Sequence, residues 1–170
     1  FLKKLCGDHA PLPPIPGVRL IALAGLGGTL AIGIVALLAQ SIFRGRSDFR
    51  FIRRNLRLVF GLPDVPFSQP RNVIAGHFLS SLIGLVCLTV LGPYWWSLAI
   101  AVGLAISAMM WTRTVHPPAG SNPVIVFLTQ PSWGFLLFPT LAGSLLLALV
   151  ALLYLNSTRP TRYPKTGNHH

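Results

Sequence analysis

Two short polar segments carry the side chains of this sequence that are best suited to chemistry. Arginine and asparagine N–H groups, and backbone N–H groups next to a glycine, are good donors to small anions. Histidine titrates near neutral pH and can carry a proton. These residue types therefore predict a binding site for a small monovalent anion. The candidate ligands are Arg71, Asn72, His77, Arg113, His116, Gly120, Ser121 and Asn122.

The same residues also have structural interpretations, which the sequence leaves open. Arg71 and Arg113 can anchor helix ends at a membrane surface. His77 can hydrogen-bond to a neighbouring helix, and Asn72 and Asn122 can satisfy broken backbone. A second set is expected to shape the backbone around the candidate ligands: Gln69, Pro70, Gly76, Pro117, Pro118 and Ala119.

Catalysis, metal binding and nucleic-acid binding are not expected. Asp8, Asp48 and Asp64 are the three acidic residues, and they form no carboxylate pair. Cys6 and Cys87 are too far apart in sequence for a metal-ligand spacing. The net charge of +11 would suggest nucleic acid in a soluble protein, but here the cations flank apolar segments. We expect no enzyme activity, no cofactor, no metal and no nucleic-acid partner.

Long apolar stretches must position these residues. The chain is 52% hydrophobic and 10% charged, whereas soluble domains carry about 25% charged residues. Four stretches lack Asp, Glu, Lys and Arg and are about long enough to cross a bilayer: Leu20–Phe43, Val73–Leu91, Tyr94–Thr112 and Trp133–Leu155. The first is too long for a signal peptide. We expect an all-α membrane protein with four full transmembrane helices, whose main partner is the lipid bilayer.

Shorter features fill the remaining sequence. Residues 1–18 are Pro-rich, residues 19–155 form the predicted transmembrane domain, and residues 156–170 form a polar, basic tail. Pro117, Pro118 and Pro123 interrupt any regular helix, yet "PVIVFL" is too apolar for a loop in water. We therefore expect a broken half-span whose helix begins near Ser121 or Asn122, and a second broken segment before it in the chain.

Small residues at four-residue spacing predict helix packing faces: Gly25/Thr29/Gly33, Gly76/Ser80/Gly84 and Ala99/Gly103/Ser107.

The segments "SQPRNVIAGH" (68–77) and "MMWTRTVHPPAG" (109–120) together resemble the HPP family of integral membrane proteins. The resemblance runs from about residue 19 to residue 155, and "RYPK" at 162–165 resembles the family's tail. Some plant and cyanobacterial members are implicated in nitrite transport across chloroplast or plasma membranes. The resemblance thus implies a transporter or channel for a small monovalent anion such as nitrite. The alternative is a non-transporting structural or binding membrane protein.

The arginine-rich stretch 44–58 departs from the family. Members usually carry a small-residue stretch like "GSFGATSVL" just before the "FG" that stands here at 60–61. Codons for Ser47–Leu58 read one base later can spell "LIFGSFGATSVL", so we predict a compensated frameshift over 44–58, which resequencing would test. The restored "GATSVLVFG" resembles "AGSNPVIVFL" at 119–128. This likeness predicts two three-element halves arranged as an inverted repeat.

The basic residues predict the orientation. Six lie near the chain ends: Lys3, Lys4, Arg19, Arg159, Arg162 and Lys165. Eight lie elsewhere: Arg44, Arg46, Arg50, Arg53, Arg54, Arg57, Arg71 and Arg113. The shifted frame removes four of the eight and Asp48, which lowers the net charge to 11 − 4 + 1 = +8. Both ends are then favoured inside. We expect a multi-pass protein of the bacterial inner (plasma) membrane that forms a homo-oligomer.

Overall fold

The structure, a computed structural model, describes residues 17–19, 22 and 59–165. Every regular element of residues 59–165 is helical, as the sequence predicts. Except for Ala22, the predicted first span Leu20–Phe43 lies outside the described residues, and so does the stretch 44–58. The count of four full transmembrane helices, the frameshift and the inverted repeat therefore stay predictions.

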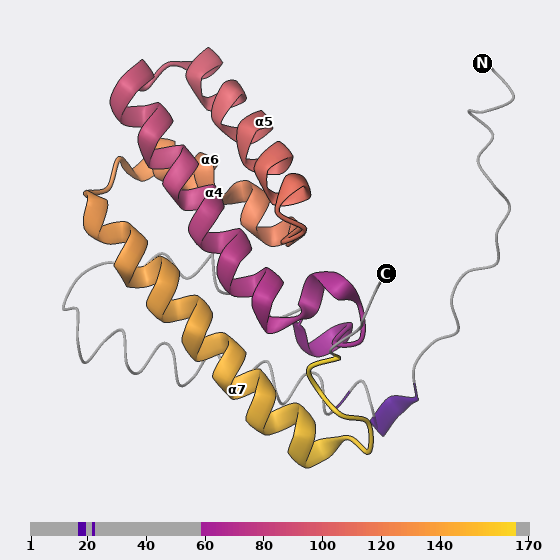
Figure 1. Ribbon diagram of the computed structural model, residues 1–170. Helices are drawn as coiled ribbons and strands as arrows, with labels where there is room; N and C mark the ends of the chain where they lie inside the picture. The colour runs from indigo at the N-terminus through magenta and orange to yellow at the C-terminus, as the bar shows by residue number, and fades with distance from the viewer. Residues whose placement is uncertain (1–16, 20–21, 23–58, 166–170) are drawn as a thin grey trace, which may run out of the picture.

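Helices α4 (Pro70–Leu91) and α5 (Trp95–Trp111) form an antiparallel pair (Figure 1). Pro70 stands in the first turn of α4, where a missing N–H costs nothing. Gly92 ends α4 with a φ of 80° that residues with a side chain rarely adopt, and Pro93 follows. The 22 residues of α4 suffice to cross a bilayer. The 17 residues of α5 rise about 26 Å, slightly less than a typical hydrocarbon core.

The segment after α5 is broken, as predicted. A short 3-10 helix, η2 (Pro117–Ser121), leads into α6 (Asn122–Thr129), so the helix begins at one of the two residues expected. Helix α6 has eight residues and rises about 12 Å, which covers less than half of a bilayer. It packs against both α4 and α5. Irregular backbone beside it is therefore covered by protein.

The last apolar stretch is a broken helix instead of the regular one predicted over Trp133–Leu155. It consists of η3 (Trp133–Leu136), a single π-helical turn η4 (Leu137–Leu141) and α7 (Ala142–Thr158). Phe138 has extended backbone angles (φ −140°, ψ 127°), because the ring of Pro139 clashes with the preceding residue when that residue is helical. Helix α7 runs alongside α4 in the opposite direction (Figure 1). Pro70–Leu91 and Trp133–Thr158 are the two described helices that are long and apolar enough to cross a membrane.

The basic residues of 59–165 lie at one end of these helices. Arg71 donates to the carbonyl oxygen of Thr112 at 3.3 Å, which joins the start of α4 to the end of α5. Arg159, after α7, pairs with Asp64 at 2.6 Å, before α4. This cationic end comprises Arg71, Arg113, Arg159, Arg162 and Lys165. The charge count that set Arg71 and Arg113 apart from the C-terminal cations is therefore wrong, because the segment carrying α6 takes the chain back across the bundle.

The small-residue stripe predicted on α4 is a packing face. A Cβ atom on Gly76 would lie 2.9 Å from the Cβ of His116, and one on Gly84 would lie 3.0 Å from the Cα of Pro123. Between them, the Ser80 hydroxyl donates to the carbonyl oxygen of Ala119 at 2.7 Å. The stripe therefore receives η2 and the start of α6.

Helix α5 packs through a different face from the one predicted. Its buried residues are Ser97, Ala101, Ala105 and Met109. The predicted stripe of Ala99, Gly103 and Ser107 is exposed in the part of the chain that the structure describes. A small substitution on this exposed stripe should therefore leave the packing of α5 unchanged.

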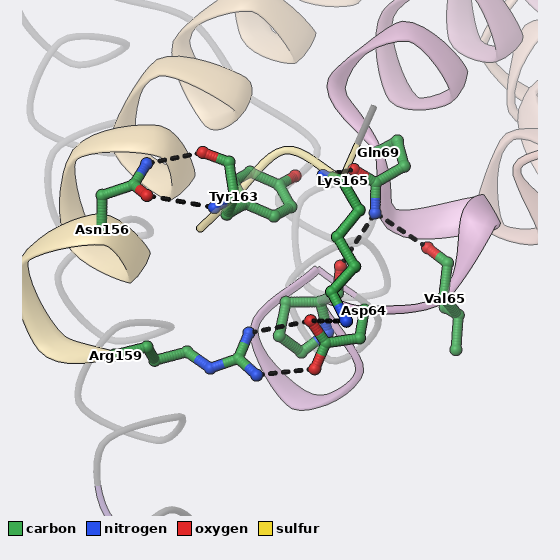
Figure 2. Close-up of polar contacts among 8 residues, drawn as sticks. Asp64, Val65, Gln69, Asn156, Arg159, Tyr163 and Lys165 are labelled. Atoms are coloured by element: carbon green, nitrogen blue, oxygen red, sulfur yellow. Dashed lines mark hydrogen bonds and ion pairs between the residues drawn. The ribbon is translucent and has the colours of Figure 1, made fainter. Parts of the chain in front are cut away.

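Residues 159–165 fold back onto the turn before α4 (Figure 2). Asp64 accepts ion pairs from Arg159 at 2.6 Å and from Lys165 at 3.2 Å. The Gln69 side chain accepts from the Lys165 backbone N–H at 2.8 Å and donates to two carbonyl oxygens of the turn. The phenol of Tyr163 donates to the carbonyl oxygen of Ser68 at 2.6 Å, and burial raises its pKa, which keeps the donor protonated. The tail thus holds the short 3-10 helix η1 (Pro66–Ser68) in place.

Acid should weaken this tail contact. The hydrogen bond from Arg159 lowers the pKa of the Asp64 carboxyl below its ordinary value. Because the folded pKa is lower than the unfolded one, the stabilisation is fully present above the ordinary value of about 4 and is lost as the pH falls through the folded value. The side chain is 42% exposed, so screening should limit the effect to about 1 kcal/mol or less.

The measurement is the thermal midpoint in detergent at neutral and acidic pH, for the unmodified protein and for Asp64→Asn. We expect the unmodified protein to lose more stability on acidification than the variant. Every other acidic residue is the same in the two proteins, so its titration cancels in the comparison. Equal losses would show that the ion pairs at Asp64 contribute nothing.

Candidate functional site: a buried polar cluster at mid-depth

Helix α4 carries its polar side chains in its middle. Counting from Pro70, His77, Ser80 and Ser81 are the eighth, eleventh and twelfth of its 22 residues. All three are fully buried. At 1.5 Å per residue, Ser80 lies about 15 Å from the start of the helix, which is near the midplane of a bilayer core about 30 Å thick.

The start of α6 and the break before α7 meet α4 at this depth. Nδ2 of Asn122 lies 2.8 Å from Oγ of Ser81, 3.1 Å from Nδ1 of His77 and 3.2 Å from the carbonyl oxygen of His77. The Ser81 hydroxyl is 3.3 Å from the hydroxyl of Thr140. The ring of His116 meets the ring of His77 edge to face, with 5.0 Å between centroids. These fully buried residues form the central polar cluster: His77, Ser81, His116, Asn122 and Thr140.

Hydrogen bonds to the backbone hold the cluster in place. Nδ2 of Asn72 donates to the carbonyl oxygen of Val115 at 2.9 Å. Nδ1 of His116 lies 2.7 Å from the carbonyl oxygen of Phe67, in η1. Together with the bond from Ser80 to Ala119, these contacts supply partners for irregular backbone that would otherwise be costly inside a membrane. The position of His116 therefore depends on α4 and on the turn that the C-terminal tail covers.

One atom of the cluster stands out. Oδ1 of Asn122 is buried and has no hydrogen-bond partner within the part of the chain that the structure describes. Buried polar atoms are nearly always paired, and an unpaired one lowers stability unless water or a ligand supplies the partner. The cluster thus contains an open acceptor at mid-depth.

The structure brings some of the predicted ligands together and keeps others apart. His77, His116 and Asn122 come together in the cluster. Arg71 and Arg113 are exposed at the cationic end. Arg71 precedes His77 by six residues, or about 9 Å along the helix axis.

Gly120 and Ser121, in the predicted anion-binding turn, are not members of the central polar cluster. The Ser121 hydroxyl donates to the carbonyl oxygen of Pro118 at 2.8 Å. Gly120 has open space where a side chain would stand. Both residues border a groove of about 520 Å³ whose other walls are apolar, among them Ile106, Met110 and Val124. An apolar wall offers an anion no hydrogen bonds, so this groove is a poor anion site.

Sequence reasoning missed two members of the cluster. Ser81 follows His77 by four residues and therefore lies on the same face of α4, a spacing that could have identified it. Thr140 directly follows Pro139. A proline inside an apolar stretch breaks or kinks a helix, so the side chains next to it point in a different direction from those of a regular helix. Both signals are present in the sequence.

Comparisons with known proteins support a membrane protein. The family profile described as "HPP, transmembrane region" matches residues 13–164. A transmembrane protein of Dictyostelium discoideum is 32% identical over an alignment of 178 positions, gaps included, which covers 96% of this chain and 61% of that protein. A second transmembrane protein of the same organism is 36% identical over 115 residues, which cover 63% of this chain and 37% of that protein. The chain spans less than two thirds of the length of either relative. No solved structure matches.

Proposed function

Because the chain belongs to the HPP transmembrane family, we propose that it is a transporter or channel for a small monovalent anion such as nitrite. The central polar cluster is its substrate site. The observation that carries this proposal is a fully buried polar cluster at mid-depth, where a half-length helix and a broken helix meet. Substrate sites of many transporters lie near the midplane, between discontinuous helices. Nitrite comes from the resemblance to the plant and cyanobacterial members.

The chemistry of the cluster suits weak binding of a small anion. Hydroxyl, amide and imidazole groups from Ser81, Asn122 and Thr140, with the two histidines, are neutral hydrogen-bonding partners. The N-terminal end of α6 adds a partial positive charge. A permeating ion must be bound well enough to enter and weakly enough to leave. The cationic end supports this role from a distance, since exposed cations raise the local concentration of anions.

Orientation and assembly belong to the same proposal. Cations flanking membrane helices favour the cytoplasmic side, and all five Lys and Arg residues of 59–165 lie at the cationic end. The C-terminus is then inside, in a bacterial plasma membrane, and an even number of crossings places the N-terminus there too. A single chain with this few membrane segments encloses little space for a transport pathway. The transporting unit is therefore a homo-oligomer.

One observation favours the rival, a structural membrane protein without transport. Members of the cluster hydrogen-bond to one another across α4 and α6. Such bonds between helices also occur where their role is only to hold helices together. The two functions differ in whether an anion crosses the membrane.

The test is nitrite flux into proteoliposomes that contain the purified full chain, expressed from a gene whose reading frame over 44–58 has been verified. Flux should exceed that of protein-free vesicles. Ser81→Ala should lower it about tenfold, the effect of losing one buried hydrogen bond. Ser107→Ala, which removes an exposed hydroxyl from α5, should leave it unchanged. No flux above protein-free vesicles would favour the structural protein.

A further inference from the structure

The open acceptor on Asn122 restricts what the central polar cluster can bind. Nδ2 already faces Ser81 and two atoms of His77. Rotating the Asn122 side-chain amide by 180°, which exchanges Oδ1 and Nδ2, does not give every polar atom of the amide a partner. Oδ1 would then face the carbonyl oxygen of His77 at about the same 3.2 Å separation, an unfavourable contact between acceptors, and Nδ2 would occupy the open position. The arrangement as observed calls for a ligand that donates a hydrogen bond to Oδ1.

A bare oxyanion is a poor match for that acceptor. Nitrite presents acceptor atoms and a negative charge, which a carbonyl oxygen repels. A charge at mid-depth in a membrane is also costly unless it is neutralised. The protonated oxyacid, HO–N=O, has one O–H donor for Oδ1 of Asn122 and acceptor atoms for hydroxyls such as those of Ser81 and Thr140. It is also neutral.

We propose that the cluster takes up the anion together with one proton, as the neutral oxyacid, so that transport is an electroneutral proton–anion symport. This inference rests on the transport function proposed above. The proton comes from the water on the side where the anion enters and forms the O–H bond of the oxyacid. That bond breaks on the other side, where proton and anion are released. One proton and one anion cross, and no net charge moves.

The histidines provide a place for the proton on its way. Among residues 59–165, His77 from α4 and His116 before η2 are the titratable side chains of the cluster, with rings 5.0 Å apart. Helix α6 and η4 contribute the neutral Asn122 and Thr140. Asp64, Arg71 and Arg113 lie toward the cationic end, outside the cluster. A proton taken up by either ring can pass to the anion as the O–H bond of the oxyacid forms, which leaves the ring neutral again.

The experiment measures proton movement and voltage dependence in proteoliposomes of the full chain. The vesicles enclose a pH-sensitive dye, a potassium gradient with valinomycin sets the membrane potential, and nitrite is added outside. We expect protein-dependent uptake to acidify the lumen with one proton per nitrite. Its initial rate should be the same at inside-positive and inside-negative potentials. For a charge-moving uniport, 100 mV would change the accumulation ratio about 50-fold.

Three controls separate the outcomes. Protein-free vesicles measure nitrous acid that crosses the lipid unaided, and this rate is subtracted. Asn122→Leu, which removes Oδ1, should lower the protein-dependent rate about tenfold, and Ser107→Ala should not. If Asn122→Leu does not fold, the voltage dependence of the unmodified protein still decides.

Uptake that follows an inside-positive potential without acidification would overturn the symport and leave anion transport standing. No protein-dependent uptake at all would overturn the transport function, and the symport with it.

Discussion

Replacing Gly76 with alanine is expected to destabilise the protein, whereas the same substitution at Gly103 is not. The new Cβ at position 76 would lie 2.9 Å from the Cβ of His116 and 3.0 Å from the carbonyl oxygen of Thr114. Neither atom is the tip of a flexible side chain, so α4 and the segment before η2 would have to separate. At Gly103 no atom lies within 4 Å of the added Cβ.

Gly76→Ala and Gly103→Ala share a stabilising gain in helix propensity, and only Gly76→Ala adds a destabilising overpacking. Alanine is about 1 kcal/mol better than glycine inside a helix, and both glycines are helical. Overpacking a filled interior costs about 1–3 kcal/mol. The difference between the variants should therefore be about 1–3 kcal/mol. It is measured by unfolding each protein in detergent with increasing SDS, followed by tryptophan fluorescence.

Gly84→Ala provides a second comparison on the same stripe. Its Cβ would lie 3.0 Å from the Cα of Pro123, which also belongs to the backbone of the docked segment. We expect a loss similar to that of Gly76→Ala. Equal stability of the variants at positions 76, 84 and 103 would mean that η2 and α6 do not pack on α4 as the structure places them.

The packing of α4 could be predicted from sequence, and that of α5 could not. On α4, Gly76, Ser80 and Gly84 form one small-residue face, so the spacing identifies it. Helix α5 has two such faces, since Ser97, Ala101 and Ala105 repeat the spacing of Ala99, Gly103 and Ser107. In lipid, hydrophobicity does not distinguish an outward face from a packed one. Only the position of the neighbouring helices decides between them.

Part of the candidate site could be predicted from sequence, and part depends on tertiary structure. His77, His116 and Asn122 are conspicuous because polar groups are rare in apolar surroundings. Ser81 and Thr140 are less so, because small hydroxyl residues are common in membrane helices and commonly bond to their own backbone, as Thr89 does to Leu85. Their role depends on where α6 and the break at Phe138 bring the chain, which is a tertiary property.

The side on which Arg71 and Arg113 lie could not be deduced from charge. Counting charges requires the number of crossings, and a segment with an eight-residue helix can be read as a surface loop or as part of a crossing. The ion pair between Asp64 and Arg159 resolves this, because it places the end of α7 beside the start of α4. The tail "RYPK" likewise reads as a basic extension, although Tyr163 is buried.

Replacing His77 with phenylalanine is expected to lower nitrite flux about 100-fold, whereas Arg71→Gln and Arg113→Gln should retain most of it. Phenylalanine keeps a ring of similar size but removes both ring nitrogens, including the one that Asn122 contacts at 3.1 Å. Losing the contact with Asn122 and the ring nitrogen that can carry the proton, each contributing about tenfold, predicts a decrease of about 100-fold. The measurement is the initial rate of nitrite uptake by proteoliposomes, with the size-exclusion profile in detergent as the check on folding.

Ionic strength distinguishes the two kinds of variant. The arginines are exposed, so they act on a diffusing anion through a field that salt screens within about 10 Å at 0.1 M. An impermeant salt should therefore slow the unmodified protein and slow the arginine variants less. The loss in His77→Phe should not change with salt, because that contact is buried. If the arginine variants are inactive at every salt concentration while His77→Phe still transports, the anion binds at the cationic end, and the central polar cluster only joins the helices.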